Sequence, residues 1–388
     1  MAQLLLLRGA KQLLTLRGPN CARRGAALQE LSIIPDGSLL IHDGRIHSVG
    51  TTRRIENLKE ARGADEIDVS DKIVMPGFVD AGIHLSCGSE APQRRPRLTS
   101  FYEESLSLMR SCLQHGTLNA QVKIGDENVD WRSDLSLIGQ LAKVGDQPIG
   151  MIRSWRIGNR PHQNFLLPDD YQAAFSKLAS RQLIHAIEVI AGSGAPVSDI
   201  WTAMARLKDF GVSLHWRGES HELLAGLLER VQPQSVSCRR NLTAGERAVL
   251  AQANVPVAVS IGESLTEDTA MGGVRQLTES GAAIALSSGY HPRETPVFNM
   301  QMIIALAVLR LRLTTEEAIS AATINPAYAL GLGDAIGSLE VGKRADVLVM
   351  NLQDYREMPR QFGVNHVGMA IREGKIIFNR TGRKVSAA

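Results

Sequence analysis

Eight apolar, strand-like runs that alternate with helical patterns are the feature of this 388-residue chain that most restricts its fold. This alternation is typical of strand-helix-strand units, in which the strands lie parallel and helices cover the sheet. Eight such units predict a closed (β/α)8 TIM barrel. The runs lie near Phe78 and at Leu118 to Lys123, Ile149 to Arg153, Ile184 to Ile190, Val212 to His215, Ser235 to Cys238, Val255 to Ser260 and Ala283 to Ser288.

The N-terminal residues predict a few short strands. The segments Leu4 to Leu7 and Gln12 to Leu16 are apolar and are separated by a turn. Ser38 to Val49 carries Asp43-Gly44 between two alternating runs, which is the strongest hairpin signal in a short sequence. We therefore expect antiparallel strands before the barrel begins.

The C-terminal residues mirror this pattern. Ala345 to Met350 predicts one strand, and Glu373-Gly374 predicts the turn of a hairpin between His366 to Ile371 and Lys375 to Phe378. Neither end alone has enough strands for a stable sheet. The expected domains are one β-sandwich built from both termini and one barrel, at residues 1–75 with 343–388 and at residues 76–342.

Composition is that of a globular protein of mixed charge. The net charge is +3 and basic residues are spread along the chain, which does not indicate nucleic-acid binding. The four cysteines (Cys21, Cys87, Cys112 and Cys238) are far apart, which argues against a disulfide framework or a zinc knot. No apolar run is long enough to span a membrane. We expect a cytoplasmic protein, with a homodimer as the default assembly.

Three stretches carry a family resemblance. Ile73 to Leu85 resembles the first barrel strand of the amidohydrolase superfamily, and Ala322 to Asp346 resembles its closing helix and return strand. The run from Asp354 to Asn365 is similar to that of imidazolonepropionases. The resemblance extends from about Ser38 to Phe378. It implies a hydrolase of the C–N bond of a cyclic amide, in which metal-bound water is the nucleophile.

The resemblance also implies a metal site, but this chain lacks several of the residues that would bind the metal. The family takes two histidines from the first strand, one from the fifth, a further one on the sixth and an aspartate from the eighth. Only His84 and His215 remain here, because Gly82, Cys238 and Gly289 stand at the other positions. Two neutral ligands without a carboxylate do not complete a zinc site, which needs at least three protein ligands.

Positions on the substrate side differ as well. Asp126 stands where the family has tyrosine, and Ala191-Gly192 replaces its Cys-Glu, so the glutamate that would activate water is missing. His291-Pro292-Arg293 replaces its Asn-Pro-Gly. The sequence therefore favours a non-catalytic relative that uses no cofactor.

Basic residues follow most of the strands, at the end of the barrel where this fold places its sites. Arginine offers a planar fork suited to carboxylate or phosphate, so we expect a small anionic ligand, such as a dicarboxylate. The alternative is that these cations face solvent or pair with Glu90, Asp126, Glu219 and Glu294. The cations are Arg94, Arg95, Arg97, Lys123, Arg153, Arg156, Arg217, Arg239, Arg240 and Arg293. The candidate ligand-binding residues are Lys123, Arg217, His215, His291 and Arg293.

Two further functions remain open. One is an active hydrolase whose site, with zinc or iron, is rebuilt by residues such as Glu90, Glu188, Glu219 or His291. The other is a metal-free hydrolase that uses Cys238 or Cys87 as nucleophile.

Each candidate also has a structural interpretation. His84 and His215 could be hydrogen-bonded strand-end groups, Cys238 a small buried hydrophobe, and Lys123 the partner of Asp126 or another carboxylate. Asp80 is expected to keep a structural hydrogen bond. The other histidines are expected at the surface or in turns, at His42, His47, His115, His162, His185, His221 and His366.

Overall fold

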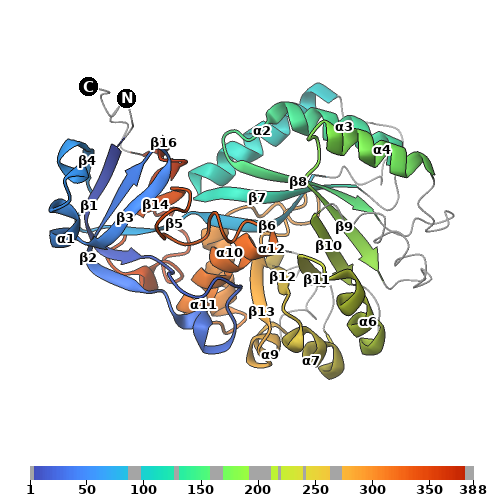
Figure 1. Ribbon diagram of the computed structural model, residues 1–388. Helices are drawn as coiled ribbons and strands as arrows, with labels where there is room; N and C mark the ends of the chain where they lie inside the picture. The colour runs from blue at the N-terminus through green and yellow to red at the C-terminus, as the bar shows by residue number, and fades with distance from the viewer. Residues whose placement is uncertain are drawn as a thin grey trace.

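The chain forms a barrel and a smaller sheet, which lie side by side in Figure 1. The computed structural model describes residues 4–85, 98–125, 131–157, 169–191, 211–216, 220–238, 242–262 and 273–380. Among these residues, no helix is long and apolar enough to cross a membrane.

The eight parallel strands expected from the sequence are all present, and they are hydrogen-bonded in chain order from β6 to β13. This order confirms the (β/α)8 barrel. The strands are β6 (Phe78–His84), β7 (Thr117–Ile124), β8 (Gly150–Ile157), β9 (Ala186–Ala191), β10 (Gly211–Trp216), β11 (Ser235–Cys238), β12 (Pro256–Ser260) and β13 (Ala283–Ser287).

The first and last barrel strands meet through a short set of contacts. The His84 amide donates to the Tyr290 carbonyl at 2.8 Å, and the Ser287 hydroxyl donates to the Gly82 carbonyl at 2.8 Å. The Asp80 carboxylate Oδ1 accepts from the amides of Gly82 and Ser288, at 3.0 and 2.9 Å. Asp80 is fully buried, and this burial raises the pKa of its carboxyl group. Asp80 therefore has the structural hydrogen bonds expected of it, and they join β6 to the end of β13.

Helices cover the barrel. Thr243 and Thr314 cap α7 and α11 with reciprocal capping boxes, each formed with the glutamate three residues further along the chain. The barrel helices are α2 (Leu98–Gln114), α3 (Trp131–Val144), α4 (Asp169–Ser180), α6 (His221–Val231), α7 (Ala244–Gln252), α9 (Gly273–Glu279), α10 (Met300–Leu309), α11 (Thr315–Ala321) and α12 (Ile324–Ala329). The helix α1 (Thr52–Glu56) packs against the smaller sheet instead, and short 3-10 helices lie at Gly25–Gln29, Glu60–Gly63 and Tyr355–Glu357.

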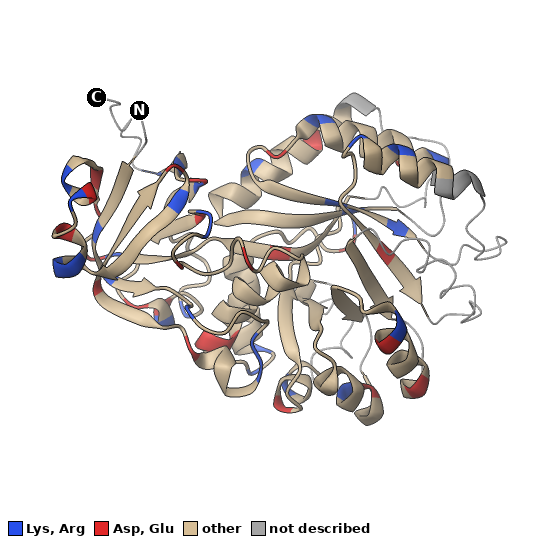
Figure 2. Ribbon diagram, viewed as in Figure 1, with Lys and Arg blue, Asp and Glu red and all other residues tan. Residues whose placement is uncertain are grey.

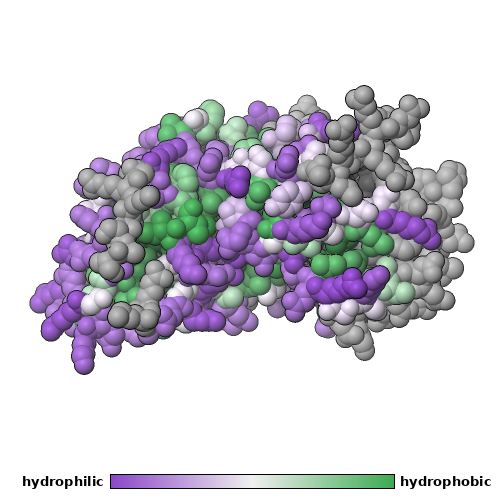
Figure 3. Space-filling view, turned by 90° about the horizontal axis from the view of Figure 1, so that it is seen from above, coloured by the Kyte–Doolittle hydropathy of each residue, from purple (hydrophilic) through white to green (hydrophobic). Residues whose placement is uncertain are grey.

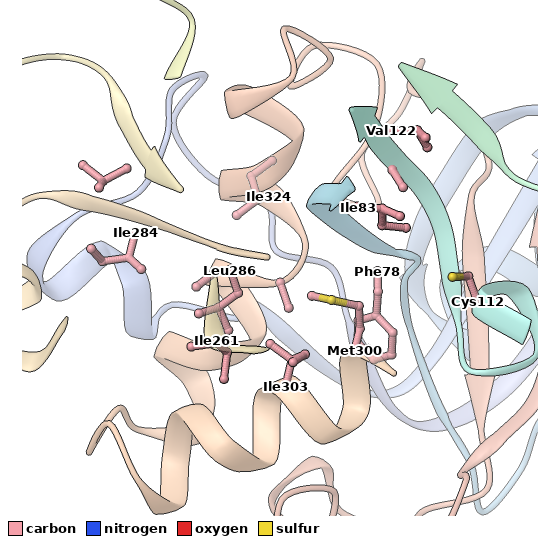
Figure 4. Packing of buried hydrophobic residues seen from close by; sticks show 14 of the residues in the cluster. Phe78, Ile83, Cys112, Val122, Ile261, Ile284, Leu286, Met300, Ile303 and Ile324 are labelled. Carbon is pink, nitrogen blue, oxygen red and sulfur yellow. The ribbon is translucent and has the colours of Figure 1, made fainter. Parts of the chain in front are cut away.

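The largest apolar core lies between the barrel strands and these helices. Figure 4 shows Met300 of α10 beside Phe78 of β6, with Leu286 and Ile303 close by. Each of these four side chains is fully buried. Burial of apolar surface of this kind contributes about 25 cal/mol per Å², so this layer holds the helices on the barrel.

Both termini contribute strands to one β domain, as the sequence predicts, and these strands are hydrogen-bonded into a single mixed sheet. Its order is β16-β15-β14-β5-β1-β2-β3, with β4 paired to β1, and β5 joins the N-terminal strands to β14. In Figure 1 the blue and red strands of this sheet intermix. The strands are β1 (Leu4–Leu14), β2 (Ile33–His42), β3 (Arg45–Thr51), β4 (Asp65–Asp68), β5 (Ile73–Pro76), β14 (Val347–Met350), β15 (Val367–Arg372) and β16 (Lys375–Asn379).

The two expected hairpin turns are also present. Asp43 and Gly44 have φ values of 47° and 78°, and Glu373 and Gly374 have 52° and 74°. Two consecutive residues with positive φ are typical of the tightest hairpin turns. The prediction of two separate N-terminal strands is wrong, because Gly9, at φ 78°, allows β1 to continue through an irregularity between Leu7 and Ala10.

The face seen from above in Figure 3 is mostly hydrophilic, and its green apolar areas are separated by purple ones. In the residues drawn in colour, this view therefore shows no continuous apolar face.

Replacement of Asp80 tests the junction between β6 and the end of β13. We expect Asp80→Ala to lower the free energy of unfolding by about 1–3 kcal/mol for each of the two buried amides left without an acceptor. Asp80→Asn keeps an acceptor oxygen, so it should lower the free energy of unfolding by clearly less than Asp80→Ala does. Urea denaturation followed by circular dichroism measures both, and equal losses for the two variants would contradict this role.

Candidate functional site

Six polar side chains come from consecutive barrel strands, five of them near the carboxyl ends, where this fold places its sites, and Glu188 from the middle of its strand. The strand register sets them side by side in pairs: His84 is opposite Lys123, Arg156 is opposite Glu188, and His215 is opposite Ser237. In Figure 2, blue segments near the ends of β7 and β8 lie beside a red segment of β9. We call these residues the mouth cluster; its members are His84, Lys123, Arg156, Glu188, His215 and Ser237.

Glu188 is the centre of the mouth cluster. Its Oε1 accepts from Lys123 Nζ at 2.6 Å and from the Ser237 hydroxyl at 3.2 Å, and Arg156 Nε lies 3.0 Å from its Oε2. Burial alone would raise the pKa of Glu188, but the Lys123 and Arg156 charges outweigh it and hold the pKa well below its usual value. Glu188 is therefore ionised and paired, which makes it a poor proton acceptor.

Two cations face this one carboxylate, so the paired groups carry a net positive charge. Lys123 is 5% exposed, and the Arg156 side chain is 13% exposed. Among the described residues, Glu188 is the only partner of either cation. Lys123 has three donors and Arg156 has five, so most of their donors remain for other groups.

The two remaining family histidines belong to the same cluster. His215 Nδ1 lies 2.7 Å from the Ser237 hydroxyl. Burial, together with the nearby Arg156 and Lys123 charges, holds the pKa of His84 well below its usual value. His84 is therefore neutral, and it adds no charge to the site.

The end of the Lys123 side chain lies beside Gly82, the position at which the resemblance implies a metal ligand. A Cβ atom on Gly82 would lie 3.2 Å from both Lys123 Nζ and Cε, and 3.0 Å from the Ser287 hydroxyl. At a separation of about 4 Å and an effective dielectric constant of about 20, two unit charges repel by about 4 kcal/mol, and a divalent ion is repelled about twice as strongly. The residues present therefore do not fit the metal ion of the family.

The rearranged metal site gains no support from the described residues. No group of three or more His, Cys, Asp or Glu side chains in this part of the chain could hold a metal ion. Glu188 does lie near the two histidines, but both of its oxygens face cations. Glu90 and Glu219, the other carboxylates considered, lie outside the described residues.

Gly289, the position at which the resemblance implies an aspartate, lies in a turn. Gly289 has a φ of 62°, in the left-handed region that favours glycine, and its amide donates to the Ser287 hydroxyl at 3.1 Å. His291 Nδ1 accepts from the amides of Arg293 and Glu294, at 3.4 and 3.2 Å. Arg293 is exposed. These two hydrogen bonds of His291 lie within its own turn, and its charge also acts on His84 of the mouth cluster.

The other predicted cations divide into two groups. Arg153 lies on the same strand as Arg156 but points away from the mouth cluster, because its guanidinium donates to the carbonyls of Leu183 and Gln182 and pairs with Asp146 at 3.3 Å. The remaining ones lie outside the described residues: Arg94, Arg95, Arg97, Arg217, Arg239 and Arg240.

Two further sequence interpretations can be compared with the structure: the structural interpretation of Cys238 agrees with its packing, and the surface position expected for His366 is wrong. Cys238 follows Ser237 on β11, and alternate strand residues face opposite sides. Cys238 accordingly packs against the apolar core between strands and helices, which does not suit a nucleophile in the barrel mouth; Cys87 lies outside the described residues. His366 was expected at the surface or in a turn, but it is only 3% exposed. It directly precedes β15, and its ring Nε2 lies 3.3 Å from the Gln361 carbonyl oxygen.

The sequence reasoning missed Ser237 and did not combine Glu188 with Arg156. The periodicity of the strands could have indicated that these residues lie together. Lys123, Arg156 and Glu188 each lie near the end of a predicted strand, and such positions converge in a parallel barrel. The expected partner of Lys123 was Asp126 or another carboxylate, and the structure identifies Glu188.

Comparisons with known proteins agree with this fold. Residues 224–377 match the model of the Amidohydrolase family. The chain is 25% identical to an imidazolonepropionase of Alkaliphilus metalliredigens, over 97% of this chain and 98% of that protein. It is 24% identical to an imidazolonepropionase of Bacillus velezensis, over 97% of each chain.

Solved structures of other hydrolases share the fold at low sequence identity. A triazine hydrolase variant superposes with a TM-score of 0.75 at 17% identity, over 99% of this chain and 96% of that one. The ochratoxinase of A. niger superposes with a TM-score of 0.73 at 16% identity, over 99% and 98% of the two chains.

Replacement of Glu188 tests the electrostatics of the cluster. We expect Glu188→Gln to lower the free energy of unfolding by about 3–5 kcal/mol, because it leaves two buried cations facing each other without a counter-charge. The double variant Lys123→Met, Glu188→Gln should recover part of that loss. Urea denaturation of the wild type, both single variants and the double variant measures the coupling, and strictly additive losses would contradict the pairing.

Proposed function

We propose that this chain, a member of the amidohydrolase superfamily, binds a small anionic molecule at the mouth of its barrel and does not hydrolyse a cyclic amide. The observation that carries the proposal is the composition of the mouth cluster. Lys123 and Arg156 face a single carboxylate in a buried setting, and a net positive charge there attracts an anion.

Arg156 is suited to hold the ligand. Its Nε faces Glu188, so the pairing fixes the side chain while its terminal nitrogens have no partner among the described residues. A planar guanidinium held in this way can donate two parallel hydrogen bonds to a carboxylate. We therefore propose a small carboxylate, such as a dicarboxylate, as the ligand, with Arg156 as its main contact and Lys123 as a second charge.

The relatives suggest the competing function. They are named imidazolonepropionase, so the reaction to test is hydrolysis of imidazolonepropionate. That reaction, in the family manner, needs a metal-bound water and a carboxylate to accept its proton. The mouth cluster offers instead two histidines and a glutamate already paired with two cations. We expect no zinc-dependent hydrolysis above background, and turnover at ordinary enzymatic rates would refute the binding-only proposal.

Thermal shift with small anions tests the binding directly. We expect at least one carboxylate in a panel of mono- and dicarboxylates and phosphates to stabilise the protein, by about 2.7 kcal/mol when it is present at about 100 times its Kd. The stabilisation should weaken at high salt, because part of the attraction is electrostatic.

Matched variants show where the anion binds. Arg156→Gln should remove most of the stabilisation, and Lys123→Met should reduce it. Arg310→Gln makes the same change of charge at an exposed position of the described chain and should leave it unchanged. Absence of stabilisation by every anion, or equal stabilisation in all four proteins, would overturn the proposal.

A further inference from the structure

We infer that the ammonium group of Lys123 fills the space of a missing metal ligand and excludes a metal ion from this barrel mouth, so that the chain supplies its own fixed cation. The inference concerns the same site as the proposed function but does not depend on it. A lysine could fill this place whether or not an anion binds beside it.

The first support is the position of Lys123 Nζ. It lies 3.2 Å from the position of a Cβ atom built on Gly82. The resemblance implies that the first histidine ligand of the family would stand at this position. Gly82 leaves room for the end of the lysine side chain: a Cβ atom at position 82 would make a tight contact with it, and a histidine ring would need more of the same space. The loss of the histidine and the placement of the lysine are therefore one structural change.

The second support is the surroundings of the ammonium group. Its charge acts on His84 and on Glu188, and Glu188 is in turn affected by His215. A chain of contacts runs from Lys123 through Glu188 and Ser237 to His215. The ammonium group thus lies among the surviving family histidines, with a carboxylate as its counter-ion.

A fixed ammonium group and a divalent metal ion exclude each other at such short range, because both are cations. Restoring the missing metal ligands at positions 82 and 289 should therefore not be enough to bind zinc. The lysine must also be removed.

Zinc retention by four purified proteins tests this inference. They are the wild type, Lys123→Met, the double variant Gly82→His with Gly289→Asp, and the triple variant that adds Lys123→Met. Each is incubated with zinc and dialysed, and its metal content is measured by atomic emission. We expect only the triple variant to retain about one equivalent, since it alone combines enough ligands with no competing cation.

The outcomes separate clearly. Retention by the double variant with Lys123 in place, or by the wild type, would overturn the inference. Lack of retention by a triple variant that still unfolds cooperatively would also overturn it, because the position would then not be a metal position.

A second experiment needs no metal. Gly82→Ala should lower the melting temperature of the wild type, and it should lower it less in a Lys123→Met background, where the contacting ammonium group is gone. Gly226→Ala is the matched control, because nothing lies within 4 Å of a Cβ at that position. Its effect should not depend on residue 123. An equal effect of Gly82→Ala in both backgrounds would contradict the placement of Lys123.

Discussion

Glu188 is a fully buried carboxylate, and the arrangement of the barrel mouth depends on how its charge is balanced. An ionised group taken out of water is stable only with close partners of opposite charge and with hydrogen bonds. Lys123, Arg156 and Ser237 supply these from three other strands. The pairing therefore fixes the ends of β7, β8, β9 and β11 relative to one another, and it sets the charge of the site at the same time.

Much of the fold could be predicted from the sequence, because its determinants are local. The apolar runs that became β6 to β13, the turns at Asp43-Gly44 and Glu373-Gly374, and the helix caps at Thr243 and Thr314 are each encoded within a few residues. β1 was missed as a single strand because Gly9 resembles a turn, whereas in the sheet it forms an irregularity that the strand passes through.

The site was less predictable, because it depends on which strand ends face one another. Gly82 alone indicated that a metal ligand was missing, but it could not show that Lys123 fills the space. Arg153 and Arg156 are equivalent candidates in the sequence. The structure separates them, because an odd spacing along β8 places their side chains on opposite sides of the sheet. Residues in the loops after the strands, such as Arg217, are as plausible from the sequence as Lys123, and they lie outside the described chain.

A fixed ammonium group differs from a metal ion in what it can do to a bound molecule. A metal ion with an open coordination position lowers the pKa of bound water and so creates a nucleophile. An ammonium group has one charge, no open coordination position and directed N–H donors, so it can hold and orient an anion but cannot activate water in this way. The glutamate beside it, kept ionised by two cations, serves as a counter-ion and is poorly placed to accept a proton. If the proposals made above hold, a lysine in this barrel mouth favours binding over hydrolysis while the surrounding strands keep the same arrangement.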